Sequence, residues 1–264
     1  MQRYELVHAG DYLAGLRFRG RQIEAIPAAI RPTDLDTAYA IQDVVVDRLL
    51  TRQGGQRIGY KIACTSKGAQ EMLHVDGPLY GQMLSFSSHA APATLRRSDF
   101  TQCVIESEFG FRMASDVPAA PAGYSAESIV PFIDALLPAI EIVNFRFVDW
   151  TVVGANSIAA DNAIHGAWVY GEPVSDWQQL NLETHEVTLA VNEKPFDAGT
   201  GAAVLGHPLN ALAWLANELS RHGKQLCAGD LVTTGVCMDV YFAEAGDRLM
   251  ADFGVLGRVA LTVT

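Results

Sequence analysis

The sequence predicts an α+β fold built on a mixed or antiparallel sheet. Helical patterns dominate the first fifth of the chain, short alternating runs fill most of the remainder, and the two do not alternate steadily as in βαβ folds. Of the 264 residues, 49% are hydrophobic and 19% are charged, which is typical of a globular protein with a sizeable core. We therefore expect a helical N-terminal region over residues 1–55 and a β-rich core over residues 56–264, together forming one structural unit.

Three segments have the signals of helices. Residues 33–54 carry an apolar stripe, with Thr33 and Asp36 as candidate N-cap residues and glycine at the end. Residues 208–223 begin with proline and give the clearest helical pattern of the chain. A further helix is predicted over residues 125–137, where the following proline would end it.

Short apolar or alternating runs predict the strands, and glycine-rich or polar segments separate them. These runs cover residues 57–63, 104–111, 139–143, 167–170, 187–191, 231–234, 240–242, 248–253 and 259–263, with a hairpin turn at 192–193. Residues 75–81 are rich in turn formers and predict a loop.

Charge and motifs exclude several classes of function. The net charge of -11 and the lack of Lys or Arg runs argue against nucleic acid or an anionic membrane as partner. The four scattered cysteines fit reduced thiols, and no secretory signal pattern or long apolar run is present, so we expect a soluble cytoplasmic protein. Motifs typical of serine hydrolases, P-loop proteins, zincins and dinucleotide-binding enzymes are also missing.

The run 104–111 places two carboxylates on one face of a predicted strand. Alternation puts Ile105 and Phe109 on one face and Glu106 and Glu108 on the other. Their backbones would be about 6 to 7 Å apart, close enough for both side chains to bind one hard cation. A half-buried strand with a solvated acidic face is the alternative, because the pattern Glu-x-Glu is common.

Two more charged residues interrupt apolar strands. Glu141 lies between Ile140 and Ile142, and a buried carboxylate is costly unless it is paired or binds a metal. Lys61 points opposite to its neighbours in residues 57–63, and the alternative to a functional role is an edge-strand lysine that reaches water. An ion pair between Arg146 and Asp149 is expected to hold the end of the strand that contains Glu141.

With these residues in place, the chain resembles the 2-keto-4-pentenoate hydratase and 4-oxalocrotonate decarboxylase branch of the fumarylacetoacetate hydrolase superfamily. The resemblance runs over nearly the full length and depends on an ordered set of motifs. They are A-Y-A-I-Q at 38–42, G-Y-K-I at 59–62, T-S-K at 65–67, V-D-G-P-L-Y-G at 75–81, E-S-E at 106–108, A-I-E-I-V at 139–143, D-N-A at 161–163, G-A-A-V-L-G-H-P at 201–208, A-W-L-A-N at 213–217, G-D-L-V-T-T-G at 229–235 and A-D-F-G-V-L-G at 251–257.

This resemblance implies a mixed β-roll or sandwich core flanked by helices, with the catalytic site in residues 56–264. It also implies Mg²⁺ or Mn²⁺ bound by Glu106, Glu108 and Glu141, with Lys61 as a catalytic residue.

Four further residues lie in loops that match the family. The resemblance implies that Asp76 is a proton-transfer partner, although a structural turn residue before Gly77 is the alternative. It implies that Ser66, Asn162 and Thr234 orient the substrate.

The implied reaction is the addition of water to a 2-hydroxy-2,4-dienoate, which gives a 4-hydroxy-2-oxo acid in the meta-cleavage breakdown of aromatic compounds. The alternatives are decarboxylation of a 4-oxalocrotonate-type acid and a catalytically weak subunit that assembles with a related decarboxylase or hydratase. The family also implies a homo-oligomer. The chain departs from the family pattern at Ala63-Cys64, at Asn144 and at Ile164-His165, where His165 is otherwise expected to be a structural histidine.

Overall fold

The computed structural model describes residues 1–264, and its helices are concentrated in the N-terminal fifth and in one late segment. The α-helices are α1 (Arg3–Arg19), α2 (Leu35–Gln53), α3 (Lys67–Leu73), α4 (Ala126–Ile129), α5 (Ala155–Ala160) and α6 (Pro208–Arg221). The strands are β1 (Arg57–Ala63), β2 (Leu79–Leu84), β3 (Ser88–Ala90), β4 (Ala93–Leu95), β5 (Val104–Met113), β6 (Ile133–Val143), β7 (His165–Tyr170), β8 (Glu186–Val191), β9 (Lys194–Thr200), β10 (Leu231–Val236), β11 (Tyr241–Phe242), β12 (Arg248–Asp252) and β13 (Arg258–Val263).

The strands form two mixed sheets, which confirms the predicted α+β class. The larger sheet has the order β2-β1-β10-β5-β6-β7-β3, and β11 pairs with β5. The smaller one has the order β4-β13-β12-β8-β9. Most neighbours are antiparallel, but β1 runs parallel to β10, β3 to β7 and β4 to β13.

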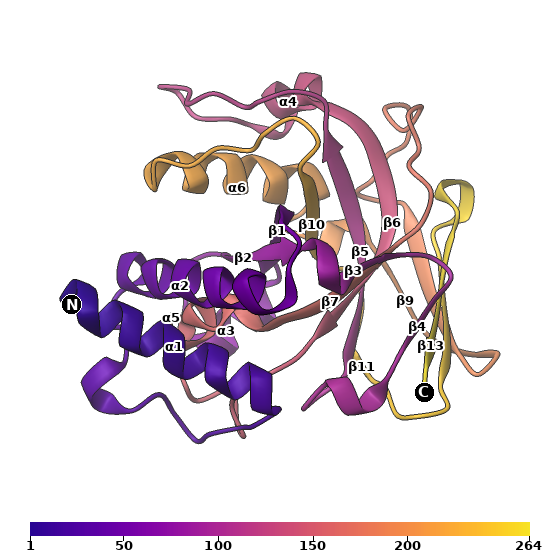
Figure 1. Cartoon of the computed structure of the whole chain (residues 1–264). Coiled ribbons are helices and arrows are strands. Elements are labelled where there is room, and N and C mark those ends of the chain that lie inside the picture. The colour runs from indigo at the N-terminus through magenta and orange to yellow at the C-terminus, as the bar shows by residue number, and fades with distance from the viewer.

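The helices and the smaller sheet lie on opposite sides of the molecule. In Figure 1, α1, α2 and α6 lie together on the left, whereas β4 and β13 stand on the right near the C-terminus. The long strands β5 and β6 run between these two parts, so they occupy the centre of the fold. Each helix is too short or too polar for a membrane span.

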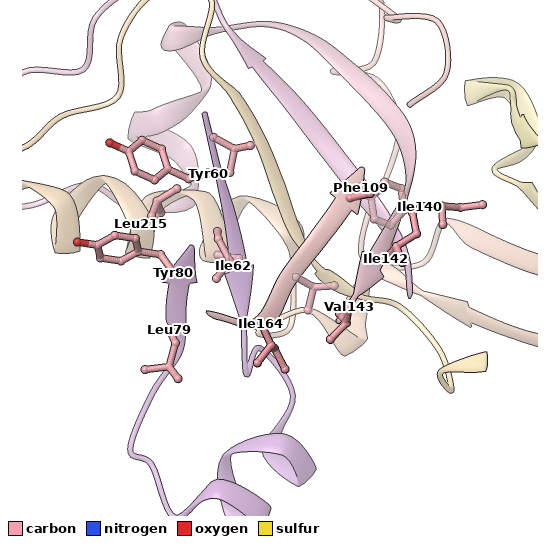
Figure 2. Close-up of a cluster of buried hydrophobic side chains, with 14 of the residues drawn as sticks. Tyr60, Ile62, Leu79, Tyr80, Phe109, Ile140, Ile142, Val143, Ile164 and Leu215 are labelled. Carbon is pink, nitrogen blue, oxygen red and sulfur yellow. The ribbon is translucent and has the colours of Figure 1, made fainter. Parts of the chain in front are cut away.

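Apolar side chains from the central strands form the core. Figure 2 shows Tyr60 and Ile62 of β1 and Tyr80 of β2 on the side of Leu215 from α6, all of them buried. The apolar stripe of α6 predicts this packing, because residues three and four positions apart share one face of a helix. Because β1 turns Tyr60 and Ile62 toward this core, the residue between them points to the opposite face.

Gly59 permits the close pairing of β1 with β10. Its φ of +151° is unusual for residues with side chains, and a Cβ atom there would lie 1.7 Å from the carbonyl oxygen of Leu231. The pairing of Gly59 with Leu231 also brings Lys61 opposite Thr233. A glycine is therefore required at this position for β1 to lie in register.

The helix predicted over residues 125–137 begins as expected but is much shorter than predicted. Only α4 and a 3-10 turn (Val130–Phe132) are helical, and β6 begins at Ile133. β6 pairs with β5 along almost its whole length, and this long-range pairing outweighs the local helical pattern. Pro138 lies inside β6, where its carbonyl accepts a hydrogen bond from Gly171 N just beyond the end of β7.

Two smaller predictions also need correction. Asp34 caps α2, not Thr33 or Asp36, because its carboxylate accepts a hydrogen bond from the backbone N–H of Thr37 at 2.7 Å. The loop predicted over residues 75–81 ends at residue 78, since β2 starts at Leu79.

Candidate active site

Two neighbouring strands bring the three predicted glutamates together. β5 and β6 are antiparallel with Glu106 opposite Glu141, and alternation along β5 turns Glu108 to the same face as Glu106. One oxygen atom from each of the three carboxylates lies within 4.8 Å of the other two. Glu108 and Glu141 are fully buried, and Glu106 is partly buried. The cluster concentrates negative charge in the interior, which requires compensation by protons or cations.

Lys61 supplies one such cation. Its Nζ lies 3.2 Å from Glu141 Oε2, and the side chain is 1% exposed. The edge-strand alternative for Lys61 is wrong, because β1 is hydrogen-bonded to β2 on one side and to β10 on the other.

The contact between Lys61 and Glu141 also shows that the larger sheet is curved. Three strand spacings, or about 14 Å, would separate β1 from β6 in a flat sheet, since neighbouring strands are about 4.8 Å apart. Parallel side chains on a flat sheet could not close that distance. The larger sheet therefore curls around the acidic cluster.

Protein donors fix two of the three carboxylates. Thr233 Oγ1 donates to Glu108 Oε2 at 2.5 Å, and Gly235 N donates to the same oxygen at 2.9 Å. His165 Nδ1 lies 2.9 Å from Glu141 Oε1. The other oxygen of Glu108, Oε1, is buried and has no hydrogen-bond partner. A buried carboxylate oxygen without a hydrogen-bond partner is free to coordinate a cation.

Burial and mutual repulsion set the protonation of the cluster. Burial raises the pKa of Glu106 to about 7, although Lys61 opposes the rise. Burial and the two neighbouring carboxylates raise the pKa of Glu108 well above its ordinary value. Burial also acts to raise the pKa of Glu141, but Lys61 and His165 outweigh it and the pKa falls.

The two basic partners of Glu141 respond in opposite directions. Burial acts to lower the pKa of Lys61, but the three glutamates outweigh it and hold the pKa above its ordinary value. Burial lowers the pKa of His165, although Glu141 opposes the shift, and this favours a neutral ring. A permanent positive charge on Lys61 therefore faces a cluster that still carries negative charge.

A small cavity of about 80 Å³ opens beside Lys61 and Glu106. Its wall is mostly apolar, with Val143, Trp150, Ile158 and Ile164 among its members. Lys61 is the only basic residue in the lining.

The structure brings some of the predicted site residues to this cavity and leaves others outside. Ser66 lines it, and Ser66 also caps α3 because its hydroxyl accepts a hydrogen bond from Ala69 N. Asp76 is exposed in the loop between α3 and β2, and it does not belong to the lining. The roles predicted for Ser66 and Asp76 stay predictions.

Asn162 and Thr234 are engaged elsewhere. Both polar atoms of the Asn162 side chain bond the backbone of Gln82, and the Thr234 hydroxyl donates to the carbonyl of Phe109. Neither residue lines the cavity, so the substrate-orienting role implied for them also stays a prediction. The adjacent Thr233 is the threonine that faces the glutamates.

Sequence reasoning did not find the supporting donors Thr233 and Gly235, and it gave no partner to His165. The Thr-Thr-Gly run follows an apolar strand start, but only the pairing of β10 with β5 shows which threonine faces Glu108. The two ring nitrogens of His165 differ: Nδ1 contacts Glu141, whereas Nε2 is buried without a hydrogen-bond partner. Its direct contact with Glu141 could not be read from residues 24 positions apart.

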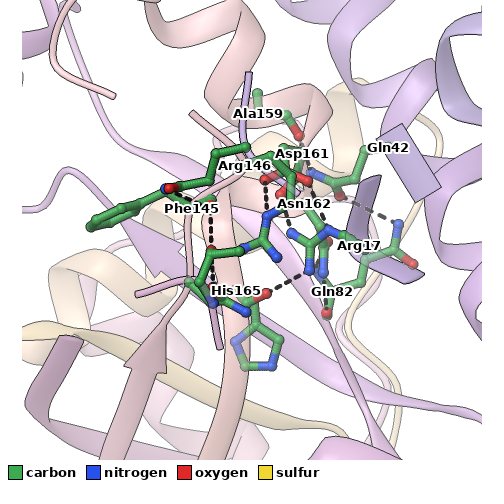
Figure 3. A network of polar contacts seen from close by, with 12 residues as sticks. Arg17, Gln42, Gln82, Phe145, Arg146, Ala159, Asp161, Asn162 and His165 are labelled. Carbon is green, nitrogen blue, oxygen red and sulfur yellow. Dashed lines mark hydrogen bonds and ion pairs between the residues drawn. The ribbon is translucent and has the colours of Figure 1, made fainter. Parts of the chain in front are cut away.

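The predicted ion pair between Arg146 and Asp149 is wrong. Arg146 Nε lies 3.5 Å from Asp161 Oδ2, whereas Asp149 accepts hydrogen bonds from the backbone and hydroxyl of Thr151. Figure 3 shows Arg146 and Arg17 on either side of Asp161. This network holds the segment that leads into β7 and thus His165.

Comparison with known proteins agrees with the geometry. Residues 66–264 match the family described as fumarylacetoacetate hydrolase, C-terminal. The chain is 32% identical to a 2-keto-4-pentenoate hydratase of Paraburkholderia xenovorans (strain LB400), over 91% of this chain and 88% of the relative. It is 33% identical to a 2-hydroxyhexa-2,4-dienoate hydratase of Comamonas testosteroni, over 82% of each chain.

A solved structure shares the whole fold. The 4-oxalocrotonate decarboxylase from Pseudomonas putida G7, complexed with magnesium and adipate, superposes with a TM-score of 0.92 at 23% identity, covering 100% of this chain and 99% of that chain. These hydratases and the decarboxylase are lyases, and the present chain is an enzyme of the same class. The chain belongs to the fumarylacetoacetate hydrolase family, among relatives named 2-keto-4-pentenoate hydratase, and it shares its fold with a 4-oxalocrotonate decarboxylase.

Proposed function

We propose that this enzyme is a metal-dependent hydratase that adds water to a 2-hydroxy-2,4-dienoate and yields a 4-hydroxy-2-oxo acid, as in the meta-cleavage breakdown of aromatic compounds. The observation that carries the proposal is the cavity beside Lys61, where a few polar residues, among them Lys61, Ser66 and Glu106, interrupt a mostly apolar lining. A 2-hydroxy-2,4-dienoate has a matching composition, with a carboxylate and a hydroxyl at one end and a hydrocarbon chain at the other. The hydratase names of the relatives support the same choice.

The donor set fits a hard divalent cation. Carboxylate oxygens are the ligands that Mg²⁺ and Mn²⁺ prefer, and three of them converge here, one with a free buried oxygen. Glu106, Glu108 and Glu141 would hold the ion, and Thr233 and His165 would keep two of these ligands in place. When bound, the ion supplies a Lewis acid that polarises the oxygen atoms of a 2-oxo acid.

Lys61 stabilises negative charge on the substrate. Because the glutamates keep its pKa above the ordinary value, the ammonium group stays protonated at neutral pH. It lines the cavity beside Glu106 and can donate a hydrogen bond to the substrate oxygen on which charge develops during ketonisation.

Ser66 and Asp76 have the remaining roles in this proposal. The Ser66 hydroxyl accepts from Ala69 N, so its own hydrogen is free to donate to the substrate carboxylate. Asp76 is the proposed proton-transfer partner, and Asp76→Asn tests that role because the substitution keeps the size of an exposed side chain.

The apolar wall favours the hydratase over the decarboxylase alternative. A 4-oxalocrotonate-type substrate carries a second carboxylate at its far end, and an unpaired carboxylate against Val143, Trp150 and Ile164 would be costly. Two departures from the family pattern, Cys64 and Ile164, line this wall and would set the preferred chain length. The decarboxylase fold neighbour keeps the second reaction as the competing candidate.

A paired assay tests the proposal. The protein is supplied with 2-hydroxypenta-2,4-dienoate or with 4-oxalocrotonate, each with Mg²⁺, with Mn²⁺ and with EDTA, and the products are identified. We expect metal-dependent formation of 4-hydroxy-2-oxopentanoate and no CO₂ release. Release of CO₂ from 4-oxalocrotonate without hydration of the dienoate would contradict the hydratase assignment. Inactivity on both substrates would favour the alternative of a catalytically weak subunit. Mixing the protein with a related decarboxylase should then restore activity.

A further inference from the structure

A second and much larger cavity, of about 820 Å³, has His165 among its lining residues. The C-terminal ends of α1 and α2 form one wall, and the segments around β3 and β4 form another. This volume lies in the range of sites that bind organic ligands and exceeds what a single inorganic ion needs. The cavity contributes nothing to the hydratase proposal, so it calls for a separate explanation.

The lining of this cavity is strongly basic although the chain as a whole has a net charge of -11. Five arginines reach it, and Asp99 is the only acidic residue among the lining residues. Apolar side chains such as Phe18, Leu95 and Phe100 lie between the charges.

Arg146 forms the floor, and two of its side-chain nitrogen atoms lack hydrogen-bond partners. The residue is 2% exposed, and its Nε and Nη2 atoms are buried without hydrogen bonds. Its nearest carboxylate, Asp161, is shared with Arg17, whose Nε lies 2.7 Å from Asp161 Oδ1 (Figure 3). One carboxylate for two guanidinium groups leaves a positive charge uncompensated in the interior.

The rim adds further positive charge. Arg19 and Arg52 make no ion pair, and both are exposed. Arg96 is neutralised by Asp99 at 3.1 Å. Five arginines thus face only two carboxylates, Asp99 and Asp161, which leaves an excess of three positive charges.

We propose that this cavity binds a small organic anion through Arg146 at the floor and Arg19 and Arg52 at the rim, with a carboxylate or phosphate group against the guanidinium groups. Arginine presents paired N–H donors that match the geometry of both groups. The apolar lining suits the carbon skeleton of such a ligand. His165, whose Nδ1 contacts Glu141, is also among the lining residues.

The depth of Arg146 in the cavity favours a free small molecule over a second copy of the chain as the ligand. An acidic side chain of another copy would have to pass the rim to reach a floor residue that is 2% exposed. A small anion can pass the rim more easily.

Calorimetric titration of the full-length, EDTA-treated protein tests the proposal. The probes are inorganic phosphate, phenyl phosphate and succinate, at constant ionic strength, so that the arms separate phosphate from carboxylate recognition. Metal-free protein prevents the probes from binding through a metal ion at the glutamates. We expect saturable binding of at least one probe with a stoichiometry of one, and tighter binding of phenyl phosphate than of phosphate.

Variants show whether the named arginines bind the probe. The double variant Arg19→Gln/Arg52→Gln is expected to weaken binding at least tenfold, whereas Arg248→Gln/Arg258→Gln, which removes two exposed arginines elsewhere, leaves it unchanged. Arg146→Met is expected to abolish binding. If this variant does not fold, the result for Arg19→Gln/Arg52→Gln tests the proposal.

Absence of saturable binding, or equal affinity of the rim variant and the wild type, would overturn the proposal. So would sedimentation that shows an oligomer dissociating in the rim variant while no probe binds, because the cavity would then be covered by a second copy.

Discussion

Replacing Lys61 by methionine removes the one lysine that faces the three glutamates while keeping a side chain of similar length. In the wild type, Nζ lies 3.2 Å from Glu141 Oε2, and both side chains are almost completely buried. The variant therefore leaves three carboxylates in the interior without their cation. We expect it to be less stable than the wild type in the absence of metal and to depend more strongly on added metal.

The size of the loss follows from the burial of the pair. Removing one partner of a buried ion pair costs about 3 to 5 kcal/mol. Glu106, with a pKa of about 7, can take up a proton and relieve part of the repulsion, so we expect the lower value, about 3 kcal/mol. For a chain of this size, each kcal/mol lowers Tm by about 2 to 4 °C, which gives a decrease of about 6 to 12 °C.

Thermal unfolding at pH 7.5, in EDTA and in saturating Mg²⁺, measures both effects. A divalent cation at the glutamates supplies the missing charge, so Mg²⁺ should raise the Tm of Lys61→Met more than that of the wild type. Arg112→Met is the matched control, because Arg112 pairs with Asp134 on the surface and is 38% exposed. Its pair is worth at most about 1 kcal/mol.

Equal Tm values of Lys61→Met and wild type in EDTA would refute the assigned charge balance. So would an equal response of both proteins to Mg²⁺, since the extra response depends on the uncompensated carboxylates.

Three further substitutions test separate parts of the account. Glu108→Gln can keep both hydrogen bonds to its carbonyl oxygen, so it should fold normally but lose metal-dependent turnover, and full activity would contradict the metal triad. Asp34→Ala should lower stability by about 1 kcal/mol at pH 7. Hydrogen bonding to Thr37 lowers the pKa of Asp34, so the cap stabilises the protein at neutral pH and this stabilisation is lost as pH falls through the lowered pKa. The stabilities of variant and wild type should therefore converge as pH falls through that pKa. A difference that stays constant would argue against the cap. Gly59→Ala should destabilise by about 3 kcal/mol or more in urea unfolding, because its Cβ would meet the backbone of β10, and a midpoint near that of the wild type would contradict the described register.

Matched controls accompany two of these variants. Glu186→Gln removes an exposed carboxylate of β8 and should leave turnover unchanged. Gly68→Ala adds a methyl group where no atom lies within 4 Å, and it should be neutral or slightly stabilising in α3.

The strands, and the face to which each glutamate points, could be predicted from the sequence because both depend on local alternation. Glu106 and Glu108 share a face through the two-residue period of a strand, and Glu141 is conspicuous as a charge between two isoleucines. That Glu106 lies opposite Glu141 depends on the register of β5 with β6, which alternation alone does not determine. The ordered family motifs supplied the link between these residues.

The errors arose where long-range pairing outweighs local preference. Residues 125–137 have a serine cap and helical spacing, yet residues 133–137 pair with β5 as the start of a strand. The partners of Arg146 and His165 were missed for a related reason, because Asp161 and Glu141 reach them through the fold and not through sequence proximity.

The most direct test of the central claim is a crystal structure of the protein with Mn²⁺, measured for anomalous scattering. We expect one strong anomalous peak within coordination distance of carboxylate oxygens from Glu106, Glu108 and Glu141, and no such peak in crystals of Glu108→Gln. A peak elsewhere in the molecule, or a wild-type cluster that stays empty at saturating Mn²⁺, would contradict the assignment of these glutamates as the metal site.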